Sequence, residues 1–275
     1  MRIGLSASPK HNTPIEWAKK NKELGCGTVV FPVDYRAEDA MIDAYATAAK
    51  ENNLMIAEVG VWRNPIAPLK EVRTEGLDYC KRQLELADRL GANCCVNVSG
   101  SMGERWDGAY KDNFSRQTWS KMVKSIQEII DSVHPKNTYY TIEPMPWMYP
   151  TGPDEYVRLL EDVGRDRFAV HMDIFNWITT PKKYFFQEEF MEECFEKLGK
   201  YIKSCHIKDV LLQQEFTIMF QETKCGEGNI CLEKYALLAN QYNKNMPMII
   251  EHLHSETEYL QSLEYVKTRL GDMID

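Results

Sequence analysis

Short apolar runs alternate with longer amphipathic stretches along the whole chain. The runs are rich in β-branched residues and end at Pro, Gly or polar residues, which predicts strands. Thr28–Phe31 has no polar alternation, and this is typical of a strand buried on both faces of a parallel sheet. The predicted strands cover residues 2–8, 28–32, 54–61, 93–99, 138–145, 168–173, 201–209 and 246–253.

The stretches between these runs carry apolar residues at helical spacing. Leu77, Leu84 and Leu90 share one stripe, and Thr13 before Pro14 is typical of a helix start. A small hairpin is expected within residues 213–223. The predicted helices cover residues 14–24, 37–51, 70–90, 116–133, 153–163, 188–198, 232–242 and 256–270.

Eight strand–helix units follow one another without a linker or a change in composition. Such alternation implies parallel strands with helical crossovers, and eight units favour a closed (β/α)8 TIM barrel. We therefore predict an α/β fold with one domain over residues 1–275. An open, doubly wound sheet is the alternative, but no G-x-G-x-x-G motif follows the first strand.

Composition and charge restrict the function. The hydrophobic fraction of 44% and the charged fraction of 27% are ordinary for a globular protein. A formal net charge of −8 argues against a nucleic-acid partner, which requires a basic face. We expect no signal peptide, no membrane span and a cytoplasmic location. The eight cysteines form no C-x-x-C motif, so we expect buried, reduced thiols.

Four consecutive predicted strands end in residues that can hold a metal or move a proton. They are Glu143, Asp173, His206 and Glu251. Each alone is more often a helix cap or a core residue, but active sites of barrels lie at the C-terminal ends of the strands. Three buried carboxylates would be costly without a cation. We therefore predict one divalent cation, with Mn²⁺ or Mg²⁺ best suited and Zn²⁺ or Co²⁺ as alternatives.

Alternation along a strand also predicts where side chains point. Residues two apart share a face, so His206 and Lys208 should point the same way. Glu251 should face inward and His252 away from it.

Several motifs resemble those of one known superfamily. They are Arg2-Ile3-Gly4, His206-Ile207-Lys208-Asp209, Gly226-Glu227-Gly228-Asn229-Ile230 and the four residues at the strand ends. Together they resemble the xylose-isomerase-like barrels, which include ketose 3-epimerases, inosose dehydratase and endonuclease-IV-like enzymes. The resemblance implies that Glu143 and Glu251 act as acid and base while also touching the metal. Asp173 and His206 would be mainly ligands.

The implied activity is that of a divalent-metal-dependent sugar isomerase or epimerase. A cation polarises a carbonyl group, and a carboxylate removes the neighbouring proton. Return of the proton to the same carbon from the other face is epimerisation, and return to the next carbon is isomerisation. Loss of a neighbouring oxygen substituent gives a dehydratase or lyase acting on a keto-sugar, an inosose or a 3-keto-glycoside, which is the alternative.

Two positions depart from the ketose 3-epimerase pattern. Asn176 stands where those enzymes carry a histidine, and Lys208-Asp209-Val210 contains no substrate-binding arginine. The His-x-Lys-Asp motif is more similar to inosose dehydratase. Lys208 is expected either to contact the substrate or to form an ion pair with an acid such as Glu251.

Aromatic residues beyond strands three to six indicate a carbohydrate substrate. Trp62, Trp106, Trp147 and Trp177 could form a pocket wall, or could pack the barrel mouth or an oligomer contact. No glycine-rich phosphate loop is evident, which favours an unphosphorylated ligand. The predicted substrate contacts are Trp62, Arg63, Asn97, Trp106, Trp147, Asn176, Trp177 and Lys208, with Arg105 as a further polar candidate.

Two other classes of function are less consistent with the sequence. A DNA-repair enzyme of the endonuclease-IV type would need a histidine-rich cluster, but the chain has six histidines, of which His134 and His252 are expected outside the site. A sugar-binding protein without activity would not need the pair Glu143 and Glu251. A homo-oligomer is left open.

Overall fold

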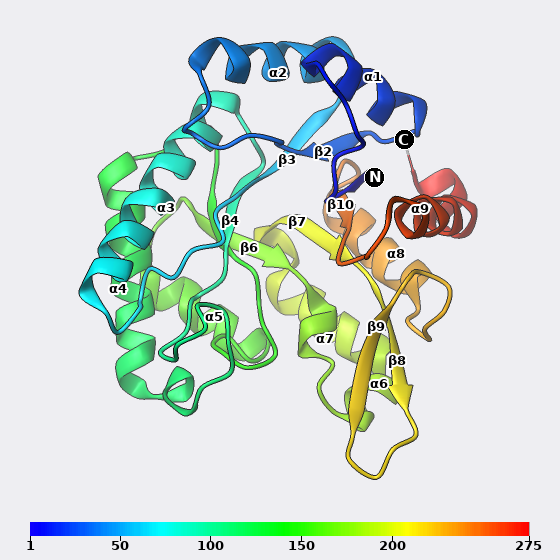
Figure 1. Cartoon of the computed structure of the whole chain (residues 1–275). Helices are drawn as coiled ribbons and strands as arrows, with labels where there is room; N and C mark the ends of the chain where they lie inside the picture. The colour runs from blue at the N-terminus through cyan, green and yellow to red at the C-terminus, as the bar shows by residue number, and fades with distance from the viewer. Residues whose placement is uncertain (275) are drawn as a thin grey trace.

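The computed structural model describes residues 1–274 and confirms the (β/α)8 barrel (Figure 1). Eight parallel strands form the ring in the order β1-β10-β7-β6-β5-β4-β3-β2. The strands are β1 (Arg2–Leu5), β2 (Thr28–Val30), β3 (Met55–Gly60), β4 (Cys94–Asn97), β5 (Tyr140–Ile142), β6 (Phe168–Met172), β7 (Ile202–Ile207) and β10 (Pro247–Ile250).

The ring closes between its first two strands. Gly27 N–H donates to the carbonyl oxygen of Ile3 at 2.9 Å, across the seam between β1 and β2. Gly4 permits this close approach, because a Cβ atom at this position would lie only 2.3 Å from Thr28 O. The glycine of the Arg2-Ile3-Gly4 motif therefore has a packing role.

Helices surround the strands and bury one face each (Figure 1). In α4, Met122, Ile126 and Ile129 face the core, and Ser115 caps the helix by accepting from Thr118 N–H at 3.1 Å. The α-helices are α1 (Pro14–Glu23), α2 (Asp39–Glu51), α3 (Lys70–Leu90), α4 (Arg116–Val133), α5 (Pro153–Val163), α6 (Pro181–Phe185), α7 (Gln187–Leu198), α8 (Leu232–Tyr242) and α9 (Glu256–Leu270). The 3₁₀ helices are η1 (Lys111–Phe114), η2 (Ile174–Trp177), η3 (Gly199–Tyr201) and η4 (Gly271–Met273).

A hairpin projects from the barrel between β7 and α8 (Figure 1). Its strands, β8 (Asp209–Gln213) and β9 (Met219–Thr223), pair antiparallel. The predicted hairpin is confirmed, but it starts earlier, because β7 ends at Ile207 and Asp209 already belongs to β8. The short helix α6 was not predicted.

Two further observations concern the polar and apolar character of the chain. All eight cysteines are free thiols, and seven of them are buried. Across residues 1–274, the length and hydropathy of the helices fall short of what a membrane crossing requires.

Candidate metal centre and active site

Four neighbouring strands bring the predicted metal ligands to one edge of the barrel. Glu143, Asp173 and Glu251 directly follow β5, β6 and β10, and His206 is the next-to-last residue of β7. Barrel hydrogen bonds fix two of these positions. The N–H of Glu143 donates to the last carbonyl of β4 at 2.8 Å, and that of Glu251 to the last carbonyl of β7 at 3.2 Å.

The ligand atoms of these residues converge. One atom from each of the four side chains lies within 4.8 Å of the others, and all four residues are buried. The Nδ1 atom of His206 lies 2.9 Å from Glu251 Oε2, 3.6 Å from Glu143 Oε1 and 4.0 Å from Asp173 Oδ2. The structure therefore brings the four residues together at one point.

Lys208 and Asn176 connect the carboxylates. The Nζ atom of Lys208 lies 2.7 Å from Asp173 Oδ2 and 2.8 Å from Glu251 Oε1, so the expected ion pair is present. Asn176 Nδ2 donates to Asp173 Oδ2 at 2.7 Å and to Glu143 Oε1 at 3.3 Å. Its Oδ1 atom accepts from Lys208 at 3.3 Å.

The charges in this cluster shift one another's pKa values. Burial raises the pKa of Asp173 to about 8, and the charges of Glu251 and Glu143 act in the same direction, against Lys208. Burial would also raise the pKa of Glu251, but His206 and Lys208 hold that pKa well below its usual range. Burial would lower the pKa of His206 and of Lys208, but the carboxylates raise both values. The cluster therefore favours positive charge at its centre.

The residues present fit a divalent cation. His206 Nδ1 is buried and makes no hydrogen bond within residues 1–274, although one carboxylate oxygen from each of three side chains lies within 4.0 Å of it. Three carboxylates and one imidazole nitrogen are a hard, oxygen-rich donor set of the kind that binds Mn²⁺ or Mg²⁺.

Glu58 of β3 lies behind this cluster and was missed in the sequence. It is 1% exposed. Its Oε1 atom accepts from Ser204 Oγ at 2.5 Å and lies 3.0 Å from His171 Nε2, and its Oε2 atom lies 3.3 Å from His206 Nε2. Burial would raise the pKa of Glu58, but His206 and His171 hold it below its usual range. The signal in the sequence was a single charge inside an apolar strand.

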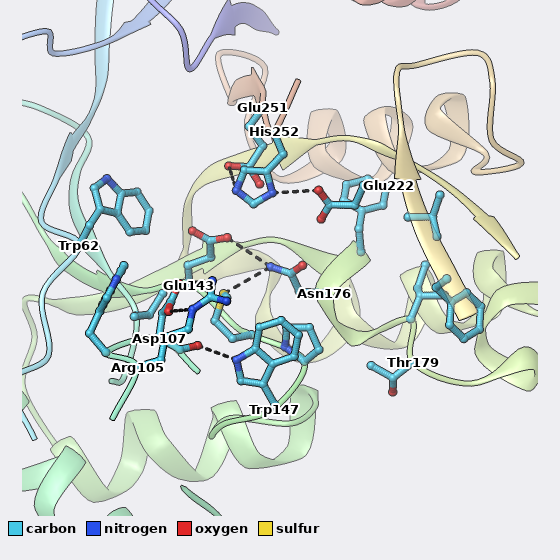
Figure 2. A pocket seen from close by; sticks show the side chains of 18 residues that line it. Trp62, Arg105, Asp107, Glu143, Trp147, Asn176, Thr179, Glu222, Glu251 and His252 are labelled. Atoms are coloured by element: carbon cyan, nitrogen blue, oxygen red, sulfur yellow. Dashed lines mark hydrogen bonds and ion pairs between the residues drawn. The ribbon is translucent and has the colours of Figure 1, made fainter. Parts of the chain in front are cut away.

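A cavity of about 730 Å³ opens beside the cluster, and Glu143 and Glu251 reach its wall (Figure 2). Aromatic side chains form much of the remaining wall, and Arg105, Asp107 and Glu222 add polar groups. The aromatic residues are Trp62, Trp106, Trp147, Phe175 and Phe220.

The structure separates the predicted substrate contacts into two groups. Trp62, Trp106, Trp147 and Asn176 line the cavity. Arg63, Asn97, Trp177 and Lys208 are not among its lining residues.

Three residues of the second group have partners away from the cavity, whereas Lys208 pairs with Asp173 and Glu251. Trp177 is buried in the core, where Nε1 donates to Pro150 O at 2.8 Å. The Arg63 guanidinium lies 4.2 Å from the centre of the Tyr79 ring. Asn97 is buried and bonds the backbone of Arg63. Trp177, Arg63 and Asn97 thus do not line this cavity, and their contact with a substrate stays a prediction.

His252 lies at the cavity wall, in contrast to the prediction that it points away. Its backbone has φ +58°, a left-handed conformation that interrupts the alternation of the strand. The Nδ1 atom lies 3.0 Å from Glu222 Oε2 on the hairpin (Figure 2). It also lies 3.3 Å from Lys208 Nζ. Glu222 was also missed, because only the folded hairpin brings it to the cavity.

The motif His206-Ile207-Lys208-Asp209 contacts the motif Gly226-Glu227-Gly228-Asn229-Ile230. The carboxylate of Asp209 accepts from the N–H groups of Gly226, Gly228 and Ile230 at 2.9, 3.1 and 3.0 Å. The N–H groups of the Gly-Glu-Gly segment therefore hold a carboxylate of this chain, which gives the segment a structural role.

A family model for xylose isomerase-like TIM barrels matches residues 18–269. The chain belongs to this family. Of the curated proteins, none matches this chain.

Solved structures of this fold include several sugar epimerases. D-psicose 3-epimerase from Clostridium cellulolyticum H10, solved with D-tagatose, is 12% identical, with full coverage of both chains and a TM-score of 0.72. 3-Keto-D-glucoside 4-epimerase from E. coli is 14% identical, with 98% of this chain and 99% of that chain covered and a TM-score of 0.70.

A Mycobacterium smegmatis xylose isomerase-like TIM barrel protein was solved in complex with magnesium. It is 17% identical, with 100% of this chain and 98% of that chain covered and a TM-score of 0.71. At these identities the similarity is one of fold.

Proposed function

We propose that this protein is a divalent-cation-dependent sugar isomerase or epimerase that removes a proton next to a carbonyl group of a sugar or cyclitol. The observation that carries the proposal is the convergence of Glu143, Asp173, His206 and Glu251 beside an aromatic-walled cavity. Membership of the xylose isomerase-like family and the epimerases that share the fold support it.

The four ligands would hold one cation, with Mn²⁺ as the first expectation and Mg²⁺, Co²⁺ or Zn²⁺ as alternatives. When bound, the cation polarises the substrate carbonyl and stabilises the negative charge that develops on its oxygen. His206 offers Nδ1, since its other ring nitrogen faces Glu58. Asp173 is held by Lys208 and Asn176 and does not line the cavity, so its role is that of a ligand.

Glu143 and Glu251 are the acid and base in this proposal. Both line the cavity, and they come from different strands, so two carboxylates reach the substrate. One takes the proton from the carbon next to the carbonyl, and the other, or the same one, returns it. Lys208 lies 2.8 Å from Glu251 and compensates its charge in the buried site.

The cavity wall suits a carbohydrate. The faces of Trp62, Trp106 and Trp147 offer apolar surface to the C–H groups of a ring, while Asn176, Glu222 and His252 offer partners to hydroxyl groups. Elimination from a keto-sugar, an inosose or a 3-keto-glycoside begins with the same proton removal and is the second candidate. A cytoplasmic location and self-association into a homo-oligomer stay predictions.

Hydrogen exchange tests the shared first step. The Mn²⁺-loaded protein is incubated in D₂O with ketoses, inososes and 3-keto-glycosides, and deuterium uptake is followed by mass spectrometry. We expect uptake next to the carbonyl of at least one substrate, and Glu143→Gln should slow it by about 10²–10⁴-fold. The exposed Glu161→Gln is the matched control and should exchange like the wild type. The identity of the product separates epimerase from lyase.

The absence of exchange with every member of the panel would contradict the proposal. So would a Glu143→Gln variant with full exchange activity on a substrate that the wild type accepts.

A further inference from the structure

Glu58 makes contacts that cross the interior of the barrel. It lies on β3, which is not a neighbour of β7 in the ring, yet its carboxylate reaches His206 and Ser204 of β7 and His171 of β6. All four residues are at most 1% exposed. A carboxylate at this depth is costly unless its partners compensate for the lost water.

We propose that Glu58 is a positioning residue that holds His206 in the tautomer and the orientation required to bind the divalent cation. This inference rests on the proposed function, because it assigns a role toward the same cation. Glu58 acts through His206 and does not itself contact the cation or the substrate.

The geometry of His206 carries the inference. Its Nε2 atom lies 3.3 Å from Glu58 Oε2, and its Nδ1 atom faces Glu251 at 2.9 Å and Glu143 at 3.6 Å. An ionised carboxylate only accepts hydrogen bonds. The contact of Nε2 with Glu58 has hydrogen-bond geometry, whereas Nδ1 makes no hydrogen bond within residues 1–274 despite its short distance to Glu251, so we assign the proton to Nε2. The lone pair of Nδ1 is then free for the cation. Partners of this kind fix the ring and raise the basicity of a metal-binding histidine.

Glu58 is itself held in place by two other donors. Ser204 Oγ donates to Oε1 at 2.5 Å, and His171 Nε2 lies 3.0 Å from the same oxygen. Since both donors bind Oε1, the Oε2 atom is directed to His206. The rings of His171 and His206 lie 4.1 Å apart at 74°, which restricts the tilt of either ring.

A second cation held by Glu58, His171 and His206 is the rival interpretation, because their ligand atoms also lie within 4.8 Å of one another. Two observations favour the positioning role. Both oxygens of Glu58 already face hydrogen-bond partners. None of the three residues lines the cavity, whereas Glu143 and Glu251 do.

The test is a calorimetric titration of the metal-free, full-length protein with Mn²⁺. We expect one Mn²⁺ per chain for the wild type and about 10–100-fold weaker binding for Glu58→Gln. The amide has a single acceptor oxygen. It can accept hydrogen bonds either from His206 or from Ser204 and His171, but not from both sides at once. Glu161→Gln, the same substitution at an exposed position outside the cluster, is the matched control, and its Mn²⁺ affinity should stay near that of the wild type.

The outcomes separate the two proposals. A wild type that binds no Mn²⁺ would overturn the proposed function as well. A wild type that binds one Mn²⁺ with the same affinity as a folded Glu58→Gln variant would overturn the role of Glu58 alone. Two Mn²⁺ per chain, with one lost in Glu58→Gln, would make Glu58 a ligand and also overturn it.

A second measurement uses the wild type only, in case Glu58→Gln does not fold. Histidine ¹⁵N–¹H spectra of the Zn²⁺-loaded protein report which nitrogen of His206 carries a proton. We expect a slowly exchanging proton on Nε2 and the metal on Nδ1. Metal on Nε2, or no protected Nε2 proton, would overturn the inference.

Discussion

Glu222 is held at the cavity wall by two cationic side chains from other elements. It lies 3.1 Å from Lys208 Nζ and 3.0 Å from His252 Nδ1. Burial alone would raise its pKa, but His252 and Lys208 lower the pKa to about 2. The folded state therefore favours the ionised form of Glu222 more than the unfolded state does.

This shift predicts a pH-dependent contribution to stability. A carboxyl group whose pKa is depressed in the folded state stabilises the fold above its unfolded pKa, about 4.5. That stabilisation is lost as pH falls toward about 2. The unfolding free energies of wild type and Glu222→Gln should thus differ most above pH 5 and converge as pH falls. Urea unfolding of both proteins from pH 7 to pH 3 measures this difference in free energy. A difference that stays constant or increases at low pH would contradict the prediction.

Single residues were predictable where local spacing determines their position. Glu143, Asp173, His206 and Glu251 stand at strand ends that parallel strands bring to one edge, so the alternation of the chain predicted that these side chains would converge. Glu58 was missed because its partners His171 and His206 are 113 and 148 residues away. His252 was placed on the wrong side because its left-handed backbone breaks the period of the strand.

Among the elements, the loop before α8 depends on a close approach between two segments. The N–H groups of Gly226 and Gly228 surround the carboxylate of Asp209. A Cβ atom at position 228 would lie 2.2 Å from Asp209 Oδ1 and 2.6 Å from Val210 N. Position 228 therefore has no room for a Cβ atom unless Asp209 or the backbone at Val210 moves.

We expect Gly228→Ala to destabilise the protein by about 1–3 kcal/mol, the usual cost of overpacking. Glu227→Ala in the same loop is the control, since Glu227 is exposed and such substitutions change stability by about 0.5 kcal/mol or less. Chemical unfolding of both variants gives the comparison. Equal stability of Gly228→Ala and the wild type would contradict this prediction, because it would show that the loop shifts to accommodate the added methyl group.

Element types were more predictable than element ends. All eight barrel strands were predicted, but most are shorter than expected, as in β5, which covers Tyr140–Ile142 within the predicted 138–145. Pro144 and Pro146 carry no N–H group and cannot continue the ladder. Apolar residues continue beyond the end of β5, because Met145 and Trp147 line the cavity. The apolar pattern alone therefore does not indicate where the strand ends.

At the scale of the whole molecule, the ring of strands explains why distant residues form one site. Glu143 and Glu251 are far apart in sequence, but β5, β6, β7 and β10 are consecutive around the barrel. The regular alternation predicted this ring. The cavity wall combines a hairpin, loops and a left-handed residue, whose positions depend on tertiary contacts, so only part of it could be predicted.

The central claim is that these four side chains bind one divalent cation. The most direct measurement is an anomalous-diffraction map from crystals grown with Mn²⁺. We predict one peak per chain, directly coordinated by oxygen and nitrogen atoms of Glu143, Asp173, His206 and Glu251. A map without a peak at this point, or with the ion at Glu58 and His171 instead, would contradict the account.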